Sequence, residues 1–306
     1  GRKEQIPWLL PMLSWRAEMR PDPAGKGEDA KPVEVIVWAE PSLPIRLAVV
    51  QALSALKAAD SLPAMIQAME REDSYNRLAI IRAILGMGET GASACLGRIV
   101  PLPYDNQSFT KRMPLLLNNG ALAAIAGQLG DDRCVPHLLD ILKLPRQHLG
   151  ADKSLTELYI EAVRLLGRYR VEKAARPLVA LLRETNIGQL SDAAEEAIRL
   201  IGRPAARPLA RGLDDWQMAP TLLRLLREKE MRTPAARDSA VAYLGHESDE
   251  VRLAALETLG LYLCEGVIEE YDAAVLESMY LDPNPEIRNR CAYWMARIKD
   301  KQGGAR

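Results

Sequence analysis

The side chains that could carry out chemistry are few and scattered in this chain of 306 residues. Each of the three histidines is isolated in its own segment, so none has the spacing of a metal ligand or of a nucleophile's base: His137, His148 and His246. The cysteines form no CxxC pair: Cys95, Cys134, Cys264 and Cys291. We expect buried single thiols in a reducing compartment, which favours the cytoplasm. We also expect no metal, no cofactor and no enzymatic activity.

Arginine is the functional residue type that recurs at fixed places. Arg176 and Arg207 occupy the same position in two AARPL motifs, and Arg211 lies one helical turn after Arg207. Arg168 and Arg203 follow the equivalent dipeptides LG and IG. Such a row, with Trp216 beside it, could bind carboxylates or phosphates in a bidentate manner. The alternative is that these arginines pair with Glu195, Glu196 or Asp214 and only hold neighbouring segments together.

Acidic residues gather toward the end of the chain, although 40 basic against 41 acidic residues leave it almost neutral. Residues 241–287 hold 11 acidic residues and one arginine. This acidic patch could attract a basic partner, or it could be an ordinary solvated face: Glu265, Glu269, Glu270, Asp272 and Glu277. The near-neutral balance makes nucleic acid an unlikely partner.

The composition indicates helices as the elements that position these side chains. The chain is 48% hydrophobic, rich in Ala and Leu, and contains a single Phe, which favours helix packed on helix. At 26% charged residues it is typical of a folded chain. No run of about 18 uncharged apolar residues occurs, so we expect no membrane span within these residues.

The sequence repeats itself. The segment RLAVVQAL at 46–53 returns as RLAIIRAI at 77–84 and RLAALETL at 252–259, and more weakly as RNRCAYWM at 288–295. Each segment opens with an arginine followed by apolar residues at helical spacing. We expect these arginines to bind neighbouring repeats together: Arg46, Arg77, Arg252 and Arg288.

A second helical pattern alternates with the first. It has apolar residues at p, p+3, p+4 and p+7, and its copies begin at Ile6, Leu62, Ala92, Val135, Ala175 and Ala206. Proline stands at p+1 or p+2 in five copies, in the first turn of a helix where a missing N–H costs nothing. Helical hairpins repeating about every 31 residues must stack to bury their apolar faces. The sequence therefore predicts an all-α fold, an α-solenoid of stacked helical hairpins.

The segments AIRLIGRPAARPL at 197–209 and AVRLLGRYRVEKAARPL at 162–178 resemble the HEAT-like repeat family, in particular the short bacterial repeats of phycobilin lyases. The resemblance covers most of residues 41–300. It implies a right-handed, armadillo-like superhelix whose second helices line the concave side, so that the arginine row would lie there. It is specific for the fold and weak for function, because such repeats serve many tasks.

The repeats predict the domain organisation. Residues 41–300 form an array of about seven repeats, and residues 301–306 are a tail. Two inserts, near 101–113 and 145–154, lengthen the period and form loops, in which Tyr104 and Phe109 are candidate binding residues. We expect residues 1–40 to be an N-terminal helical segment and linker, and a truncated repeat is the alternative. We expect a linker at 19–29, and we favour a short helix over a strand at 31–40. The chain begins with Gly1, so we expect it to be trimmed or processed, and an upstream targeting or membrane segment is left open.

These features favour a non-catalytic scaffold or adaptor that binds a protein or peptide through its groove. The alternative is a HEAT-like nucleic-acid-binding protein similar to the alkylpurine DNA glycosylases, kept open by Asp214, Asp215 and Trp216. A third hypothesis is an enzyme or chaperone similar to the phycobilin lyases, although no cysteine here is placed like a reactive thiol. The oligomeric state is left open.

Overall fold

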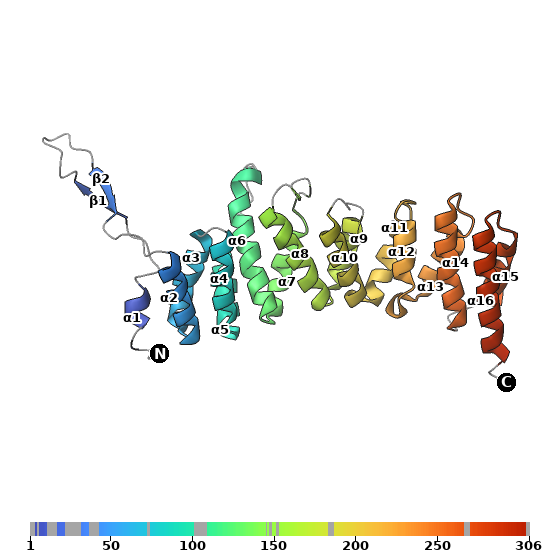
Figure 1. Cartoon of the computed structure of the whole chain (residues 1–306), viewed down its shortest axis with the longest axis horizontal. Helices are drawn as coiled ribbons and strands as arrows, with labels where there is room; N and C mark the ends of the chain where they lie inside the picture. Colours follow the sequence, from blue (N-terminus) through green and yellow to red (C-terminus); the bar gives the residue numbers. More distant parts are fainter. Residues whose placement is uncertain are drawn as a thin grey trace. The chain divides into compact units, whose positions relative to one another are not determined.

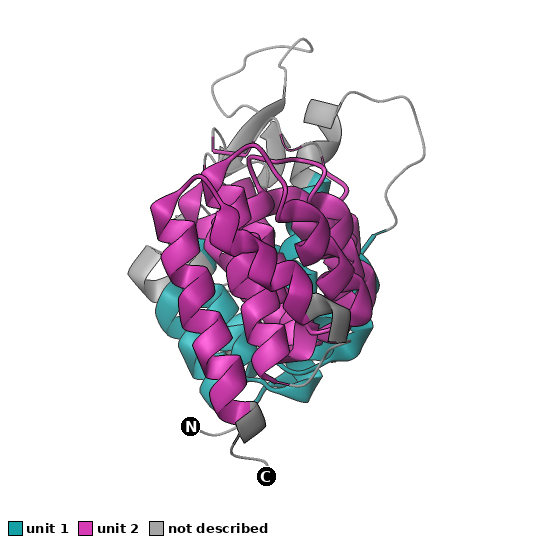
Figure 2. Cartoon of the chain, turned by 90° about the vertical axis from the view of Figure 1, so that its right-hand side faces the viewer, with its two compact units in different colours: residues 1–137 teal, residues 138–306 magenta. Residues whose placement is uncertain are grey.

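The computed structural model describes residues 4, 6–10, 17–21, 32–36, 43–71, 74–100, 109–144, 146, 149–150, 153–182, 187–265 and 270–303. The chain divides into two compact units, residues 1–137 and 138–306 (Figure 2). Nearly all the regular structure in the described ranges is helical (Figure 1). No helix in these ranges is long and apolar enough to cross a membrane.

Unit 1 consists of helical hairpins whose first helices pack on one another. The first helices are α2, α4 and α6; α2 packs on α4, and α4 packs on α6. The second helices are α3 and α5, which contact each other. The bounds are α1 (Ile6–Leu9), α2 (Leu43–Ala55), α3 (Leu62–Arg71), α4 (Ser74–Leu85), α5 (Glu89–Arg98) and α6 (Phe109–Gln128), followed by α7 (Val135–Ile141) at the division between the units.

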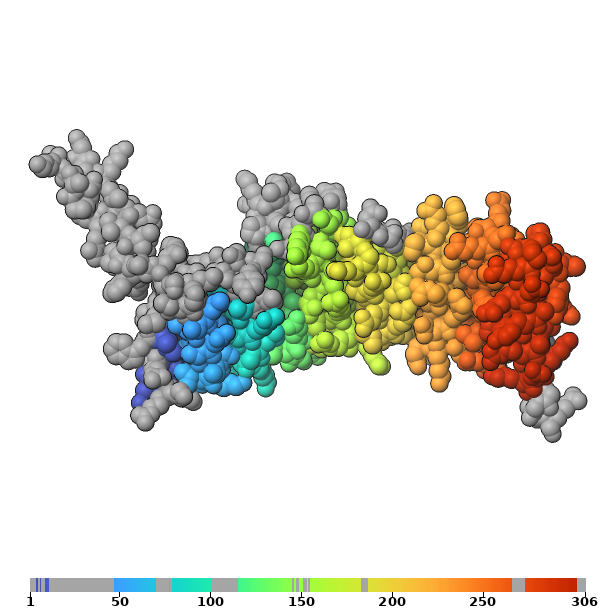
Figure 3. Space-filling view, in the orientation of Figure 1, coloured from blue at the N-terminus to red at the C-terminus, as the bar shows by residue number. Residues whose placement is uncertain are grey.

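Unit 2 repeats this arrangement. Among its first helices α8 packs on α10, α12 on α14 and α14 on α16, and among its second helices α9 packs on α11 and α11 on α13. Consecutive hairpins of this unit form adjacent bands in the space-filling view (Figure 3). The helices are α8 (Lys153–Arg168), α9 (Ala175–Leu182), α10 (Gly188–Ile201), α11 (Ala206–Gly212), α12 (Ala219–Leu226), α13 (Pro234–Tyr243), α14 (Asp249–Cys264), α15 (Glu270–Ser278) and α16 (Pro285–Gly303).

The core lies between the first and second helices, as the two apolar patterns predict. In α9 the residues at p, p+3, p+4 and p+7 are all buried: Ala175, Leu178, Val179 and Leu182. They face α10, which buries a stripe of small side chains that includes Ala194 and Ala197. Each unit is therefore a stack of helical hairpins, the α-solenoid architecture that the sequence predicts. The handedness of the superhelix stays a prediction.

A recurring turn connects the first helix of a hairpin to the second. The first helix ends at a residue with a positive φ, and a short 3-10 helix then leads into the second helix. Gly202 has φ 74° before the 3-10 helix Arg203–Ala205, and Arg170 has φ 51° before the 3-10 helix Glu172–Ala174. This left-handed conformation costs glycine little, and at Arg170 the surrounding turn imposes it on a larger residue.

Arginines at the start of the first helices hold the hairpin connections in place, as the sequence predicts. The Arg77 Nε donates to the Met69 carbonyl oxygen at 3.0 Å. Arg252 donates from Nη1 to the carbonyl oxygens of His246 and Glu247, both at 2.9 Å. Arg288 donates from Nη1 to the Asp282 carbonyl oxygen at 2.7 Å. The Arg46 side chain lies outside the described residues.

The N-terminal region differs from the sequence prediction. Residues 32–36, where we expected a short helix, form strand β2 (Pro32–Ile36), which pairs antiparallel with β1 (Ala17–Pro21) in the register Ala17 to Ile36 and Pro21 to Pro32. The prediction of a linker over 19–29 is also wrong at its first residues. The alternation of Val33 and Val35 was the correct signal, because β-branched residues every second position favour a strand.

Two further boundaries differ. Residues 109–113, which we expected to be part of an insert loop, form the first turn and more of α6, so Phe109 begins a helix. The helix α16 continues to Gly303, so residues 301–303 are helical and the predicted tail begins later. Helix ends are set by packing and capping that the apolar pattern does not encode.

Candidate functional site

The predicted arginine row lies on two neighbouring second helices of unit 2. Arg176 on α9 and Arg207 on α11 each follow a buried alanine that begins the helix, so both side chains are exposed. Arg211, one turn further along α11, is exposed as well. Because α9 packs on α11, the two equivalent positions repeat from one helix to the next.

Arg168 and Arg203 lie in the turns that lead into these helices. Arg168 is the last residue of α8, and Arg203 begins the 3-10 helix before α11; both are exposed. None of the five arginines of the row forms an ion pair or a side-chain hydrogen bond with another described residue. The alternative in which the row pairs with Glu195 is wrong, because that carboxylate binds Arg199 at 2.9 Å and Arg224 at 2.7 Å instead.

Trp216 belongs to an aromatic stack rather than standing alone. It is 54% exposed and its ring lies 6.5 Å from that of His246, with an interplanar angle of 28°. The Tyr243 ring stacks on His246 from 5.9 Å. The His246 Nδ1 accepts the Ser248 N–H at 3.0 Å, which fixes the plane of the imidazole. Burial, with a smaller contribution from the Asp214 charge, raises the pKa of Tyr243.

The other predicted site residues are not brought together. Glu265 forms an ion pair with Arg232, so it is engaged within the chain, and Glu277 is exposed on α15. Glu270 and Asp272 also lie on α15, but their side chains are outside the described residues, as is Glu269 altogether. Tyr104 and the side chain of Phe109 likewise fall outside them. The acidic patch and the loop residues remain predictions.

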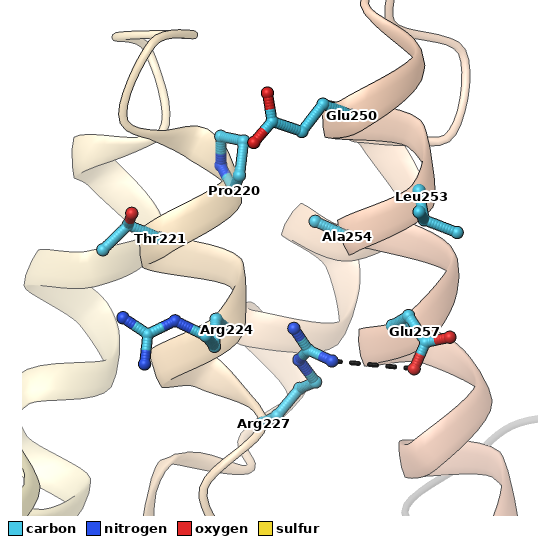
Figure 4. Close-up of a pocket in the computed structure, with 8 residues that line it drawn as sticks. All are labelled: Pro220, Thr221, Arg224, Arg227, Glu250, Leu253, Ala254 and Glu257. Carbon is cyan, nitrogen blue, oxygen red and sulfur yellow. Dashed lines mark ion pairs between the residues drawn. The ribbon is translucent and has the colours of Figure 1, made fainter.

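A groove between the first helices α12 and α14 was missed by the sequence analysis (Figure 4). It has a volume of about 310 Å³. One wall comes from α12 and the residue after it, which contribute Pro220, Thr221, Arg224 and Arg227. Thr221, Arg224 and Arg227 follow one another at intervals of three residues, and Pro220 lies four residues before Arg224, so they share one face of the helix. A search for charged residues at helical spacing could have found this wall.

The opposite wall of the groove is one face of α14. It consists of Glu250, Leu253, Ala254 and Glu257, at positions i, i+3, i+4 and i+7. Figure 4 shows Glu250 beside Pro220 at one end, and Arg227 turned toward Glu257 at the other. The groove is therefore charged at both ends, and its middle combines the apolar Leu253 and Ala254 of α14 with Thr221 and Arg224 of α12.

Ion pairs connect the groove to the neighbouring hairpins. The Arg199 Nε is 3.2 Å from Glu228, and the Arg227 Nη1 is 3.6 Å from Glu257. Glu257 also accepts a hydrogen bond from Arg290 on α16. A ladder of alternating charges thus crosses successive first helices of unit 2. Exposed pairs of this kind each contribute about 0.2–1 kcal/mol, so their main effect is to orient the side chains.

Arg227 is the exception within this ladder. Its side chain is 29% exposed, but its Nε atom is buried and has no hydrogen-bond partner among the described residues. Its 3.6 Å contact with Glu257 is longer than a normal hydrogen bond. Burial lowers the pKa of Arg227, while the Glu257 charge opposes that shift. The buried Nε is therefore an unsatisfied donor closed off from the groove, while the partly exposed remainder of the side chain lines the groove.

The cysteines are not arranged for nucleophilic chemistry. All four are buried and unpaired, as the sequence predicts. Burial raises the pKa of the Cys95 thiol to about 12 and that of Cys291 to about 11, so almost no thiolate is present at neutral pH. No group of three or more His, Cys, Asp or Glu side chains within the described ranges could hold a metal ion.

Comparisons with known proteins show no family assignment. No protein-family model matches the chain, and no curated protein matches it. Among solved structures, an engineered protein is 14% identical with a TM-score of 0.37, covering 83% of this chain and 75% of its own. A computationally designed armadillo repeat protein for modular peptide recognition is 17% identical with a TM-score of 0.30, covering 77% and 99%.

Proposed function

We propose that this helical repeat protein is a non-catalytic scaffold of the HEAT-like type that binds an acidic segment of a partner protein through its arginine row. The observation that carries the proposal is that Arg176, Arg207 and Arg211 are exposed and have no partner among the described residues. Arg199 on α10 and Arg224 on α12, in contrast, are already in ion pairs with Glu195. A row of free guanidinium groups on adjacent helices is complementary to a row of carboxylates.

The repeat geometry supports an extended partner. Equivalent arginines recur once per hairpin, so a binding segment that follows α9 and α11 meets a guanidinium in each repeat. Each exposed contact is weak alone, and affinity must come from several contacts made together. The four buried, unpaired thiols support a reducing compartment, and we include a cytoplasmic location in the proposal.

A charge-reversal experiment tests this proposal. The probe is a fluorescent peptide of alternating Glu and Ala, titrated with the full chain and followed by anisotropy. We expect the double variant Arg176→Glu/Arg207→Glu to bind at least tenfold more weakly, because attraction becomes repulsion at both positions. The matched control is Arg164→Glu on α8, another exposed arginine without a partner among the described residues.

Two outcomes would contradict the arginine row. One is equal affinity of the double variant and the wild-type chain for the acidic peptide; the other is an equal loss with Arg164→Glu, which would indicate a general charge effect. Proteins captured from the native organism should depend on the same two positions. If every captured protein still bound the double variant, the arginine row would not be the binding site.

Duplex DNA is the alternative partner, and the aromatic stack of Trp216, His246 and Tyr243, of which Trp216 is exposed, is the observation that favours it. Proteins that flip a base out of a duplex stack that base against aromatic side chains, and arginine attracts the phosphates. Titration of a duplex oligonucleotide at several salt concentrations separates the two functions. Tighter, strongly salt-dependent binding of the duplex than of the acidic peptide would favour the nucleic-acid function.

A further inference from the structure

We propose that the groove between α12 and α14 binds a short extended peptide segment that carries a carboxylate at one end and, about three residues away, a cationic side chain. The carboxylate binds at Arg227 and the cation at Glu250. This site lies on the first helices and does not depend on the arginine row, so it stands or falls separately from the proposed function.

The carboxylate end follows from the unused donors of Arg227. A guanidinium carries five N–H donors in a planar fork, and the buried Nε of Arg227 donates to no described residue. Its neighbour Glu257 is hydrogen-bonded by Arg290 from the next first helix. An incoming carboxylate in the groove would accept hydrogen bonds from the Nη groups of Arg227, of which Nη1 lies 3.6 Å from Glu257, too far for a normal hydrogen bond.

The cation end follows from Glu250. Its side chain lines the groove, is exposed, and forms no ion pair or hydrogen bond with another described residue. Beside it Pro220 offers no backbone N–H to a ligand, so the carboxylate of Glu250 dominates this end. An ammonium or guanidinium group of a bound segment is its complement.

The distance between the two ends sets the spacing of the ligand charges. Glu250 and Glu257 are seven residues apart on α14, which corresponds to about 10 Å along the helix axis. An extended chain covers about 3.3–3.6 Å per residue, so about three residues span the groove. Between the ends, Leu253 and Ala254 offer apolar surface for the residues in the middle of the segment.

The balance of charges argues against a simple anion. Two arginines face two glutamates in the groove, so a phosphate attracted to Arg227 would also be repelled by Glu257 and Glu250. Arg224 adds little free positive charge, because it is paired with Glu195 at 2.7 Å. A ligand carboxylate meets the same Glu257, which is itself hydrogen-bonded by Arg290, but a ligand that also places a cation at Glu250 gains a second attraction that a simple anion lacks.

The test uses two capped peptides and the full chain, with binding measured by calorimetry. The first peptide is acetyl-Lys-Ala-Val-Glu-amide, and the second replaces both charged residues with Gln. We expect the charged peptide to bind with a dissociation constant near 1 mM and the neutral one at least tenfold more weakly. Arg227→Gln and Glu250→Gln should each weaken the charged peptide about tenfold. The control Arg164→Gln should leave its affinity unchanged.

A charge swap keeps the test decisive if a variant is destabilised. Glu250 is exposed, so Glu250→Arg should fold, with an unfolding temperature lowered only slightly by the loss of an acidic residue from the first turn of α14. This variant should now prefer acetyl-Glu-Ala-Val-Glu-amide over the Lys-containing peptide. Arg176→Glu/Arg207→Glu should bind the charged peptide like the wild-type chain, which separates this site from the arginine row. Equal binding of the charged and neutral peptides, no binding at all, or no change of preference with Glu250→Arg would overturn the proposal.

Discussion

Arg252 and Asp282 form a buried ion pair that fixes one hairpin connection of unit 2. Their side chains are 10% and 3% exposed, and two hydrogen bonds run between them, from Nε at 2.8 Å and from Nη2 at 3.1 Å. The Arg252 hydrogen bond lowers the pKa of Asp282 and outweighs the opposing effect of burial. The same guanidinium also donates to backbone carbonyls before α14, so the pair ties two connections together.

We therefore predict that Asp282→Asn lowers the free energy of unfolding by about 2 kcal/mol at pH 7, because it removes the more buried of the two carboxylates that pair with Arg252 and leaves only Asp249, at 2.6 Å. The pKa of Asp282 is lowered by folding, so the unfolded chain binds more protons near that pKa. The pair thus contributes fully above pH 4 or so and loses its contribution as the pH falls further. Urea unfolding at pH 7 and pH 3 should show the difference between the two proteins shrinking at the lower pH.

The matched control for this prediction is Asp140→Asn. Asp140 forms an ion pair with Lys143 at 2.7 Å, but both side chains are more than half exposed, so we expect a change below about 1 kcal/mol. A difference between Asp282→Asn and the wild-type chain that stays constant from pH 7 to pH 3 would contradict the electrostatic explanation.

At the scale of elements, the close approach of α8 and α10 depends on Gly167. A Cβ atom at this position would lie 2.5 Å from the Ala197 Cα and 2.7 Å from its Cβ. The two helices can pack backbone to backbone here only because one residue has no side chain. We predict that Gly167→Ala lowers the free energy of unfolding by about 1–3 kcal/mol, through overpacking, as measured by chemical denaturation.

A second glycine supplies the control. Gly97 lies near the end of α5, is exposed, and has open space where a Cβ atom would stand. Gly97→Ala should stabilise the chain by about 0.5–1 kcal/mol, because alanine restricts the unfolded chain without a clash. If Gly167→Ala raised the free energy of unfolding as Gly97→Ala does, α8 and α10 would be able to move apart at little cost. The overpacking explanation would then be wrong.

At the scale of the whole molecule, stability should be local, because described helices contact mainly their neighbours in the repeat order. Leu209 on α11 is fully buried, and Leu209→Ala should remove about 2–5 kcal/mol through the cavity it leaves. We predict that hydrogen exchange accelerates in α9 to α13 and remains unchanged in α3 and α4 of unit 1. Equal acceleration in both units would instead indicate that the whole chain unfolds as one cooperative system.

The repeat architecture was predictable from the sequence alone because its signals are local. Apolar residues at helical spacing, a proline in the first turn and a glycine such as Gly202 in the connection lie within one hairpin, and each acts on its own segment. The burial of the cysteines and the role of Arg77, Arg252 and Arg288 followed from the same positions. The error at β2 arose where the repeat pattern was weakest and the local alternation of valines was given too little weight.

The groove and the state of each arginine were decided only by the tertiary structure. Arg224 forms an ion pair with Glu195, 29 residues away in the sequence, and Arg290 forms one with Glu257, 33 residues away. Which long side chain reaches which partner depends on the register between stacked helices and on rotamers, and neither is encoded in a repeat pattern. The sequence therefore determined which helices form and in what order, whereas three-dimensional packing decided that Arg176 and Arg207 stay free and that Arg227 faces a groove with unused donors.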